Sequence, residues 1–154
     1  MRNISAVSSG WRGGLASLGV KPGDRIGILS QNCMEMVELI GAVALLGAIL
    51  LPVNFRLQPD EIAYVLADGA PVVVIAGADY HEAIVAQQGS LPSARYYFGI
   101  GAAHPALTPF SQLSASDTPL PSTSVVGDAG FMIIHTAAVG GRPRGALLSL
   151  GDIH

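Results

Sequence analysis

Short apolar runs alternate with stretches of helical periodicity along the first hundred residues of the chain. Val7, Trp11, Leu15 and Leu18 recur at intervals of three or four, which predicts a helix that ends at Gly19. The same patterns predict strands at 25–30, 49–53, 72–76 and 96–100 and helices at about 33–47, 58–69 and 79–88. Alternation with short connections predicts an α/β fold, in which a parallel sheet is flanked by helices through right-handed crossovers.

Polar residues mark the expected helix ends. Asn32 is placed to cap the second helix, with Glu35 three residues later in the capping-box pattern. Pro59 and the acids that follow it suit the first turn of the third helix, and Asp68-Gly69 suits its end. The second helix is apolar around most of its circumference, so we expect protein to cover most of it.

Leu39 to Val53 is the one stretch that could imitate a membrane span. It is shorter than the roughly 20 residues that a spanning helix needs, and Gly47 and Pro52 interrupt it. We therefore predict a buried helix that runs into a buried strand, and no transmembrane segment.

The pattern changes after the first hundred residues. Residues 101–124 are rich in Ala, Ser, Thr and Pro, and only Phe110 and Leu113 offer much to bury, which predicts a long loop or a change of layer. Residues 125–154 carry two further strands, Phe131–Thr136 and Ala146–Ser149, joined by a glycine-rich connection. We therefore divide the chain into a βα-alternating subdomain (1–100), a connection (101–124) and a final strand–loop–strand segment (125–154).

Composition narrows the class of protein. Half of the residues are hydrophobic and 12% are charged, which indicates a sheet covered on both faces, or apolar surface meant for a missing partner domain or a homo-oligomer. The net charge of -3 provides no basic field for nucleic acid. The single cysteine, Cys33, cannot form a disulfide framework or a thiolate cluster, which favours a cytoplasmic location, and we expect it to be an inert buried thiol.

The connection between the last two strands carries the most informative chemistry. Gly140, Gly141 and Gly145 allow backbone N–H groups to approach a ligand closely. Arg142 and Arg144 add donors that can grip phosphate oxygens in pairs. The pattern predicts a site for a triphosphate, although a glycine-rich hairpin turn with two solvated arginines would produce the same spacing.

This connection lacks the Gly-Lys-Ser/Thr ending of the Walker loop. It resembles the motif T-S-G-T-T-G-x-P-K-G of the adenylate-forming superfamily, which includes the acyl-CoA synthetases. Thr136, Gly141, Pro143 and Gly145 match that motif directly, and Arg144 keeps the charge of its lysine. The chain departs from it where the family has Ser, Gly, Thr and Thr, so most of the phosphate-facing hydroxyls are missing; these positions hold Ala137, Ala138, Val139 and Gly140.

Two upstream segments strengthen the resemblance. Leu18 to Ile28 is similar to the family segment G-V-K-x-G-D-R-V-A-I. Gly47 to Leu66 is similar to G-A-x-x-x-P-x-N-x-x-L-x-x-x-E-L-x-Y-x-L. The segments occur in the family's order and cover nearly the whole chain, which is identified as the N-terminal portion of such an enzyme.

The resemblance implies a ligase that uses ATP, Mg²⁺ and coenzyme A to convert a carboxylic acid into an acyl-adenylate and then a thioester. It places phosphate contacts at Thr136, Gly140, Gly141, Arg144 and Gly145, with Arg142 at the rim. The family's adenine pocket, magnesium-binding glutamate and C-terminal lysine lie downstream of this loop, so we expect no catalytic or metal-binding residue here and no activity from the isolated chain. The alternative is a truncated or degenerate homologue that serves as a nucleotide-binding or assembly module.

Other residues carry weaker signals. The four histidines are scattered; we expect His81 and His104 on the surface and His135 in a strand beside the loop. Glu35 and Glu38 share a helix side, which is typical of a solvated edge rather than a catalytic pair. The run from Gly99 lacks the third glycine of a dinucleotide fingerprint and is expected to be a turn that ends a strand.

Overall fold

The computed structural model describes residues 4–115, 128–136, 142–149 and 151. Within this part of the chain, the strands form one seven-stranded sheet in the order β5-β4-β3-β1-β2-β6-β7. The strands are β1 (Arg25–Leu29), β2 (Ile49–Val53), β3 (Val73–Ala76), β4 (Tyr96–Gly99), β5 (Thr108–Pro109), β6 (Gly130–Thr136) and β7 (Arg144–Ser149). The helices are α1 (Ile4–Ser17), α2 (Met34–Leu46), α3 (Pro59–Gly69) and α4 (His81–Val85), with 3-10 turns η1 (Ala78–Tyr80), η2 (Gln88–Ser90) and η3 (Phe110–Ala115).

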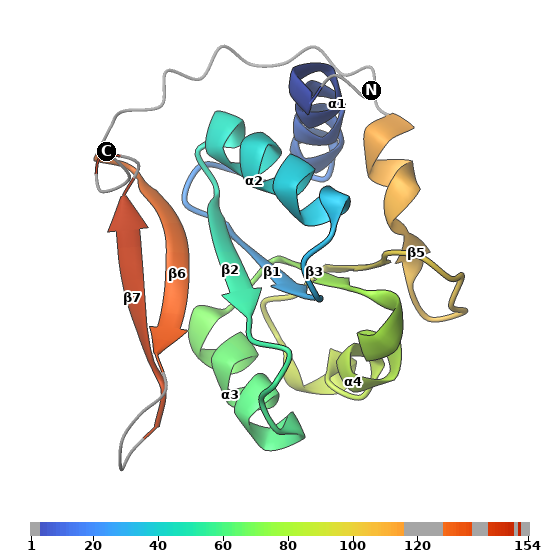
Figure 1. Cartoon of the computed structure of the whole chain (residues 1–154), viewed down its shortest axis with the longest axis vertical. Coiled ribbons are helices and arrows are strands. Elements are labelled where there is room, and N and C mark those ends of the chain that lie inside the picture. Colours follow the sequence, from blue (N-terminus) through green and yellow to red (C-terminus); the bar gives the residue numbers. More distant parts are fainter. Residues whose placement is uncertain (1–3, 116–127, 137–141, 150, 152–154) are drawn as a thin grey trace.

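The sheet is parallel except for its last strand. β1 pairs in parallel with both β2 and β3, and β2 pairs in parallel with β6. β7 returns antiparallel to β6. Right-handed crossovers from β1 to β2 and from β2 back to β3 run in opposite directions, so their helices fall on opposite faces: α2 lies with α1 on one face, and α3 lies with α4 on the other (Figure 1). The predicted α/β fold with a parallel sheet flanked by helices is confirmed.

Coverage on both faces explains the apolar composition. One core cluster joins α1, α2 and η3 to the sheet, and a second joins α3 and α4 to its other face. Every residue of β3 is buried, so this strand is a continuous apolar run rather than an alternating one. The stretch from Leu39 to Val53 is helix and then strand as predicted, and no helix in the described part of the chain is long and apolar enough to cross a membrane.

The ends of α2 and α3 differ from the prediction. Cys33, not Asn32, is the N-cap of α2, and its side chain makes no capping hydrogen bond. The predicted capping interaction occurs at α3 instead, where the backbone N–H of Gln58 donates to Glu61 Oε2 at 2.8 Å. Pro59 and the acids after it predicted the start of α3 but not this capping box, which only the structure shows. Cys33 is half-buried, so the expectation of a buried thiol was wrong.

The C-terminal end of α3 is shaped by packing. Gly69 is the last residue of the helix, and packing accounts for glycine there, because a Cβ would overlap a methyl group of Leu51 on β2. The left-handed residue is therefore Ala70, with φ 44° and ψ 57°. Arg25 stabilises this end: its Nε–H and one terminal N–H donate to the carbonyl oxygens of Gly69 and Ala70, each at 2.9 Å.

Residues 101–115 are more ordered than the expected long loop. β5 extends the sheet beside β4, and η3 packs on α1. Phe110 meets Trp11 edge-to-face with ring centroids 4.3 Å apart. Gly14 permits this contact, because a Cβ there would overlap the carbonyl oxygen of Leu113. The glycines that weaken the helical prediction for α1 therefore include one that the packing requires.

Three further predictions were wrong. The helix expected at 79–88 is shortened to α4 between the two 3-10 turns η1 and η2. His81 is 5% exposed rather than on the surface, because Gly99 leaves room for its imidazole; a Cβ there would lie 3.0 Å from His81 Nε2. Glu38 is buried at 1% exposure, since the side of α2 that carries it is covered.

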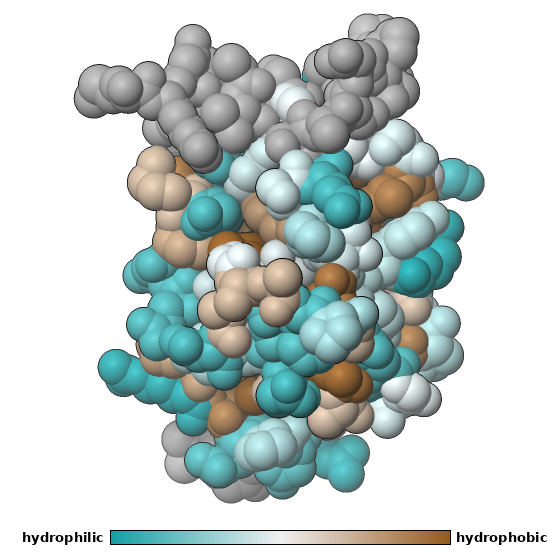
Figure 2. Space-filling view, turned by 90° about the vertical axis from the view of Figure 1, so that its right-hand side faces the viewer, coloured by the Kyte–Doolittle hydropathy of each residue, from teal (hydrophilic) through white to brown (hydrophobic). Residues whose placement is uncertain are grey.

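Most of α2 is buried or half-buried, as expected, but part of its outer side is open. Met34, Val37 and Leu45 are all exposed large apolar residues, as are Ile134 and Leu147 on the β6–β7 hairpin. The side of the molecule that carries β5 differs: it is mostly hydrophilic, with apolar residues in separate small patches (Figure 2). Uncovered apolar surface is therefore found on α2 and on the hairpin.

Candidate functional site

A pocket of about 320 Å³ opens at the carboxyl ends of three neighbouring parallel strands, β1, β2 and β6. The connection after β1 leads to α2 on one face, and the connection after β2 leads to α3 on the other. This is a topological switch point, where open α/β sheets bind their ligands. The lining residues are Ser30, Asn32, Met36, Pro52, Val53, Asn54, Phe55, Leu57, Val65, Ile134, His135, Thr136 and Pro143.

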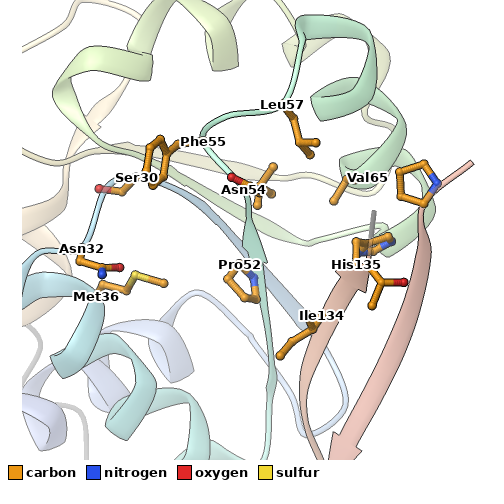
Figure 3. A pocket seen from close by; sticks show the side chains of 13 residues that line it. Ser30, Asn32, Met36, Pro52, Asn54, Phe55, Leu57, Val65, Ile134 and His135 are labelled. Atoms are coloured by element: carbon orange, nitrogen blue, oxygen red, sulfur yellow. The ribbon is translucent and has the colours of Figure 1, made fainter. Parts of the chain in front are cut away.

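The pocket has an apolar interior with a few polar groups. Met36 from α2, Pro52 from β2 and Ile134 from β6 line one part of it, while Asn54 and Leu57 line the part nearer α3 (Figure 3). Asn54 is fixed by its own turn, because its Oδ1 accepts the backbone N–H of Arg56 at 3.0 Å. An apolar site with a small number of placed polar groups is typical of small-molecule binding.

The β6–β7 hairpin brings part of the predicted phosphate loop to this pocket. Thr136 is the last residue of β6, and Arg144 is the first residue of β7 and its register partner. Thr136 lines the pocket, and so does Pro143, just before Arg144. Residues directly opposite each other in an antiparallel pair project from the same face of the sheet, so Thr136 and Arg144 do so. Among the described residues, Arg144 is exposed and forms no ion pair.

The other predicted site residues are placed differently. Arg142 lies on the α3 side, with its guanidinium carbon 5.3 Å from the ring centroid of Tyr64. Gly145 lies within β7, where a Cβ would sit 2.8 Å from Ile133 Cγ2 and 3.1 Å from the ring of His135, so packing by itself accounts for glycine there. Gly140 and Gly141 lie outside the described residues. The structure thus groups Thr136, Pro143 and Arg144, while the phosphate contacts themselves stay a prediction.

One polar contact beside the pocket was missed by sequence reasoning. His135 Nε2 lies 2.9 Å from Asp68 Oδ2 on α3. The histidine side chain is 4% exposed and the aspartate side chain 46%. The residues are 67 positions apart, so nothing in their local sequence signals the pairing.

Metal-ligating side chains do not gather anywhere in the described ranges. No group of three or more His, Cys, Asp or Glu residues there is placed to hold a metal ion. His104 forms a separate contact, with its Nε2 3.1 Å from Glu82 Oε1 at the opposite end of the sheet from the hairpin.

Comparison with known proteins identifies the family. Residues 12–154 match the family model described as AMP-binding enzyme. The chain belongs to this family. The predicted resemblance to adenylate-forming acyl-CoA synthetases is therefore confirmed at the level of the family.

Individual members of the AMP-binding enzyme family agree with this assignment. Feruloyl-CoA synthase of an Amycolatopsis species is 31% identical over 140 residues, which cover 91% of this chain and 26% of that protein. Long-chain-fatty-acid–CoA ligase FadD13 of Mycobacterium tuberculosis is 31% identical over 141 residues, which cover 91% of this chain and 27% of that protein. The chain therefore spans about a quarter of the length of these curated relatives.

A solved structure supports the fold of this segment. The crystal structure of a protein assigned as a long-chain-fatty-acid CoA ligase from Rhodopseudomonas palustris matches with a TM-score of 0.91 and 51% sequence identity. The match covers 97% of this chain and 37% of that one. The sheet and its flanking helices are thus those of an acyl-CoA ligase N-terminal region.

Proposed function

We propose that the complete protein activates a carboxylic acid with ATP and then transfers the acyl group to coenzyme A. The observation that carries this proposal is the placement of Thr136 and Arg144 as partners at the loop end of the β6–β7 hairpin, the end that lines the switch-point pocket. Because the chain spans about a quarter of its curated relatives, the activity is proposed for the whole protein. We expect the isolated 154-residue chain to form no adenylate.

The residues divide the work of holding the nucleotide's phosphates. The Thr136 hydroxyl and the Arg144 guanidinium donate to phosphate oxygens from one face of the hairpin, and the backbone N–H groups of Gly140, Gly141 and Gly145 complete the cradle. Arg142 stays at the rim, where the Tyr64 ring holds it. Arginine in the place of the family's lysine adds a second donor to this grip.

The proposed reaction requires Mg²⁺ and coenzyme A in addition to ATP. Mg²⁺ enters bound to the phosphates of ATP, as this ion commonly does, since it keeps several waters and few protein ligands. Coenzyme A supplies the thiol. A cytoplasmic location, where both cofactors are available, is part of the same proposal.

The reaction balances as two displacements. A carboxylate oxygen of the acid attacks the α-phosphorus of ATP, the bond from that phosphorus to the leaving phosphate oxygen breaks, and pyrophosphate departs. The thiol of coenzyme A then displaces AMP from the acyl carbon. The residues described here contribute by positioning the phosphates and stabilising their charge, rather than by exchanging protons.

An acid-dependent pyrophosphate-exchange assay on the complete gene product tests this function. Aromatic acids and long-chain fatty acids are the first to try, because the two relatives of equal identity are named for one of each. We expect exchange that requires both ATP and one of these acid classes. Exchange absent with every acid, in a protein that binds ATP, would overturn the ligase function.

One observation favours the alternative, in which the protein binds ATP but catalyses no exchange. Ala137, Ala138 and Val139 replace the hydroxyl-rich part of the family motif, which weakens direct contact with phosphate. A protein that binds ATP without exchange would be a nucleotide-binding or assembly module.

A further inference from the structure

His135 occupies the position directly before Thr136, at the end of β6 that faces the pocket. Its side chain is almost fully enclosed, at 4% exposure, and its Nε2 is 2.9 Å from Asp68 Oδ2. In the neutral imidazole this geometry places the ring hydrogen on Nε2, which then donates to the carboxylate. A hydrogen bond to an ionised acceptor is among the stronger polar contacts in a protein.

The His135 ring is packed between α3 and the neighbouring strand β7. Strand alternation puts it on the same face as Ile133, which packs in the core beneath α3. Its neighbour across the hairpin is Gly145, and a Cβ there would lie 3.1 Å from both Nε2 and Cε1 of the ring. The missing side chain at Gly145 is therefore what allows the imidazole to lie flat against β7 and reach Asp68.

A second contact ties the other end of the loop to the same helix. Arg142 lies over the Tyr64 ring, and Tyr64 precedes Asp68 by four residues on α3. Residues four apart share a helix face. His135 before the connection between β6 and β7, and Arg142 at its end, thus both contact one face of α3. The same helix supplies Val65 to the wall of the pocket.

We propose that His135 is a positioning residue for the phosphate loop, acting through its hydrogen bond to Asp68. The bond fixes the end of β6 against α3, and this sets the position of Thr136, the next residue, whose side chain projects from the opposite face of the strand. This inference rests on the proposed function, because it assigns a purpose to the placement of Thr136.

The test measures kcat and the KM values for ATP and for the acid in pyrophosphate exchange by the complete gene product. His135→Phe keeps the ring volume without the donor, and His135→Gln keeps a donor of similar reach. We expect His135→Phe to raise the KM for ATP about tenfold with little change in the KM for the acid, because small misplacements of binding groups are costly. His135→Gln restores most of the affinity for ATP.

Asp68 provides the partner test. Asp68→Ala removes the acceptor, whereas Asp68→Asn keeps an oxygen that can accept the bond. We expect Asp68→Ala to match His135→Phe, and the double variant to be no worse than either, because both changes remove the same contact. Should His135→Phe fail to fold, the comparison of Asp68→Ala with Asp68→Asn carries the test: a raised KM for ATP in the alanine variant alone supports the proposal.

His104→Phe is the matched control. It removes a histidine contact with a carboxylate of similar length, 3.1 Å to Glu82, at the far end of the sheet. We expect its KM for ATP to equal that of the wild type. A lowered unfolding temperature with an unchanged KM for ATP in both His135→Phe and Asp68→Ala would overturn the positioning role alone. A wild-type protein that binds no ATP would overturn the proposed function and this inference with it.

Discussion

Thr136 and Arg144 are direct register partners at the loop end of the β6–β7 hairpin, so their side chains share one face of the sheet. Arg142, only two residues from Arg144, lies against Tyr64 on the α3 side. Two arginines that look equivalent in the sequence are therefore placed differently. Only Arg144 accompanies Thr136.

We expect Arg144→Ala to weaken ATP binding more than Arg142→Ala. A charge-assisted hydrogen bond contributes about 1.5–3 kcal/mol, so Arg144→Ala should raise the KM for ATP by roughly tenfold to a hundredfold. Arg142→Ala, the matched control, should change it by no more than about fivefold, because a partly exposed cation–π contact is worth about 0.5–1 kcal/mol. Equal effects, or an unchanged KM in Arg144→Ala, would remove the phosphate role from Arg144.

Gly14→Ala should loosen η3 from α1. The added methyl group would overlap the carbonyl oxygen of Leu113, and overpacking of this kind costs about 1–3 kcal/mol. Urea unfolding followed by the fluorescence of Trp11, the one tryptophan, measures the loss beside the Phe110 contact. Gly89→Ala is the control, since nothing lies within 4 Å of a Cβ there, and it should leave the unfolding midpoint unchanged.

Ala70→Gly should raise the free energy of unfolding. Ala70 holds the left-handed conformation that ends α3, which costs a residue with a Cβ about 1 kcal/mol. Ala67→Gly, on the exposed last turn of the same helix, should instead lower stability by up to about 1 kcal/mol. Chemical denaturation of both variants checks the opposite signs, and destabilisation of both would contradict the strain assigned to Ala70.

Stability should fall at alkaline pH partly through Tyr97. Burial raises the pKa of the Tyr97 hydroxyl above its usual 10.0. The folded protein therefore holds this proton after the unfolded chain begins to release it, so the contribution is present below about pH 10 and is lost as pH rises toward the folded pKa. Urea midpoints at about pH 9 and about pH 11 should differ less in Tyr97→Phe than in the wild type, and an equal difference would contradict this linkage.

Local sequence patterns were sufficient to predict the α/β architecture. Periodic apolar positions such as Trp11 and Leu15 placed the first helix, and branched apolar runs placed the strands, because each element must bury a face or stripe whose spacing its own geometry sets. The loop motif and the two upstream segments were also sufficient for the family. Each is a contiguous stretch whose residue types are visible without knowing the neighbours in space.

Side-chain environments depended on residues far along the chain. His81 and Glu38 were expected in solvent and are buried. The space that Gly99 leaves for His81 and the elements that cover Glu38 come from distant parts of the chain, so the neighbouring sequence does not reveal them. The cap of α2 was predicted one residue early, since the extended backbone conformation that makes Cys33 the N-cap is not visible in the residue pattern.

By itself the sequence determined the order of strands and helices, the α/β class and the family, since these follow from periodicity and contiguous motifs. Only the tertiary structure decided that Arg144 accompanies Thr136 while Arg142 lies on Tyr64, and that His135 meets Asp68 across 67 positions. The physical reason is that strand register and helix crossing bring together residues whose separation along the chain carries no information about their distance in space.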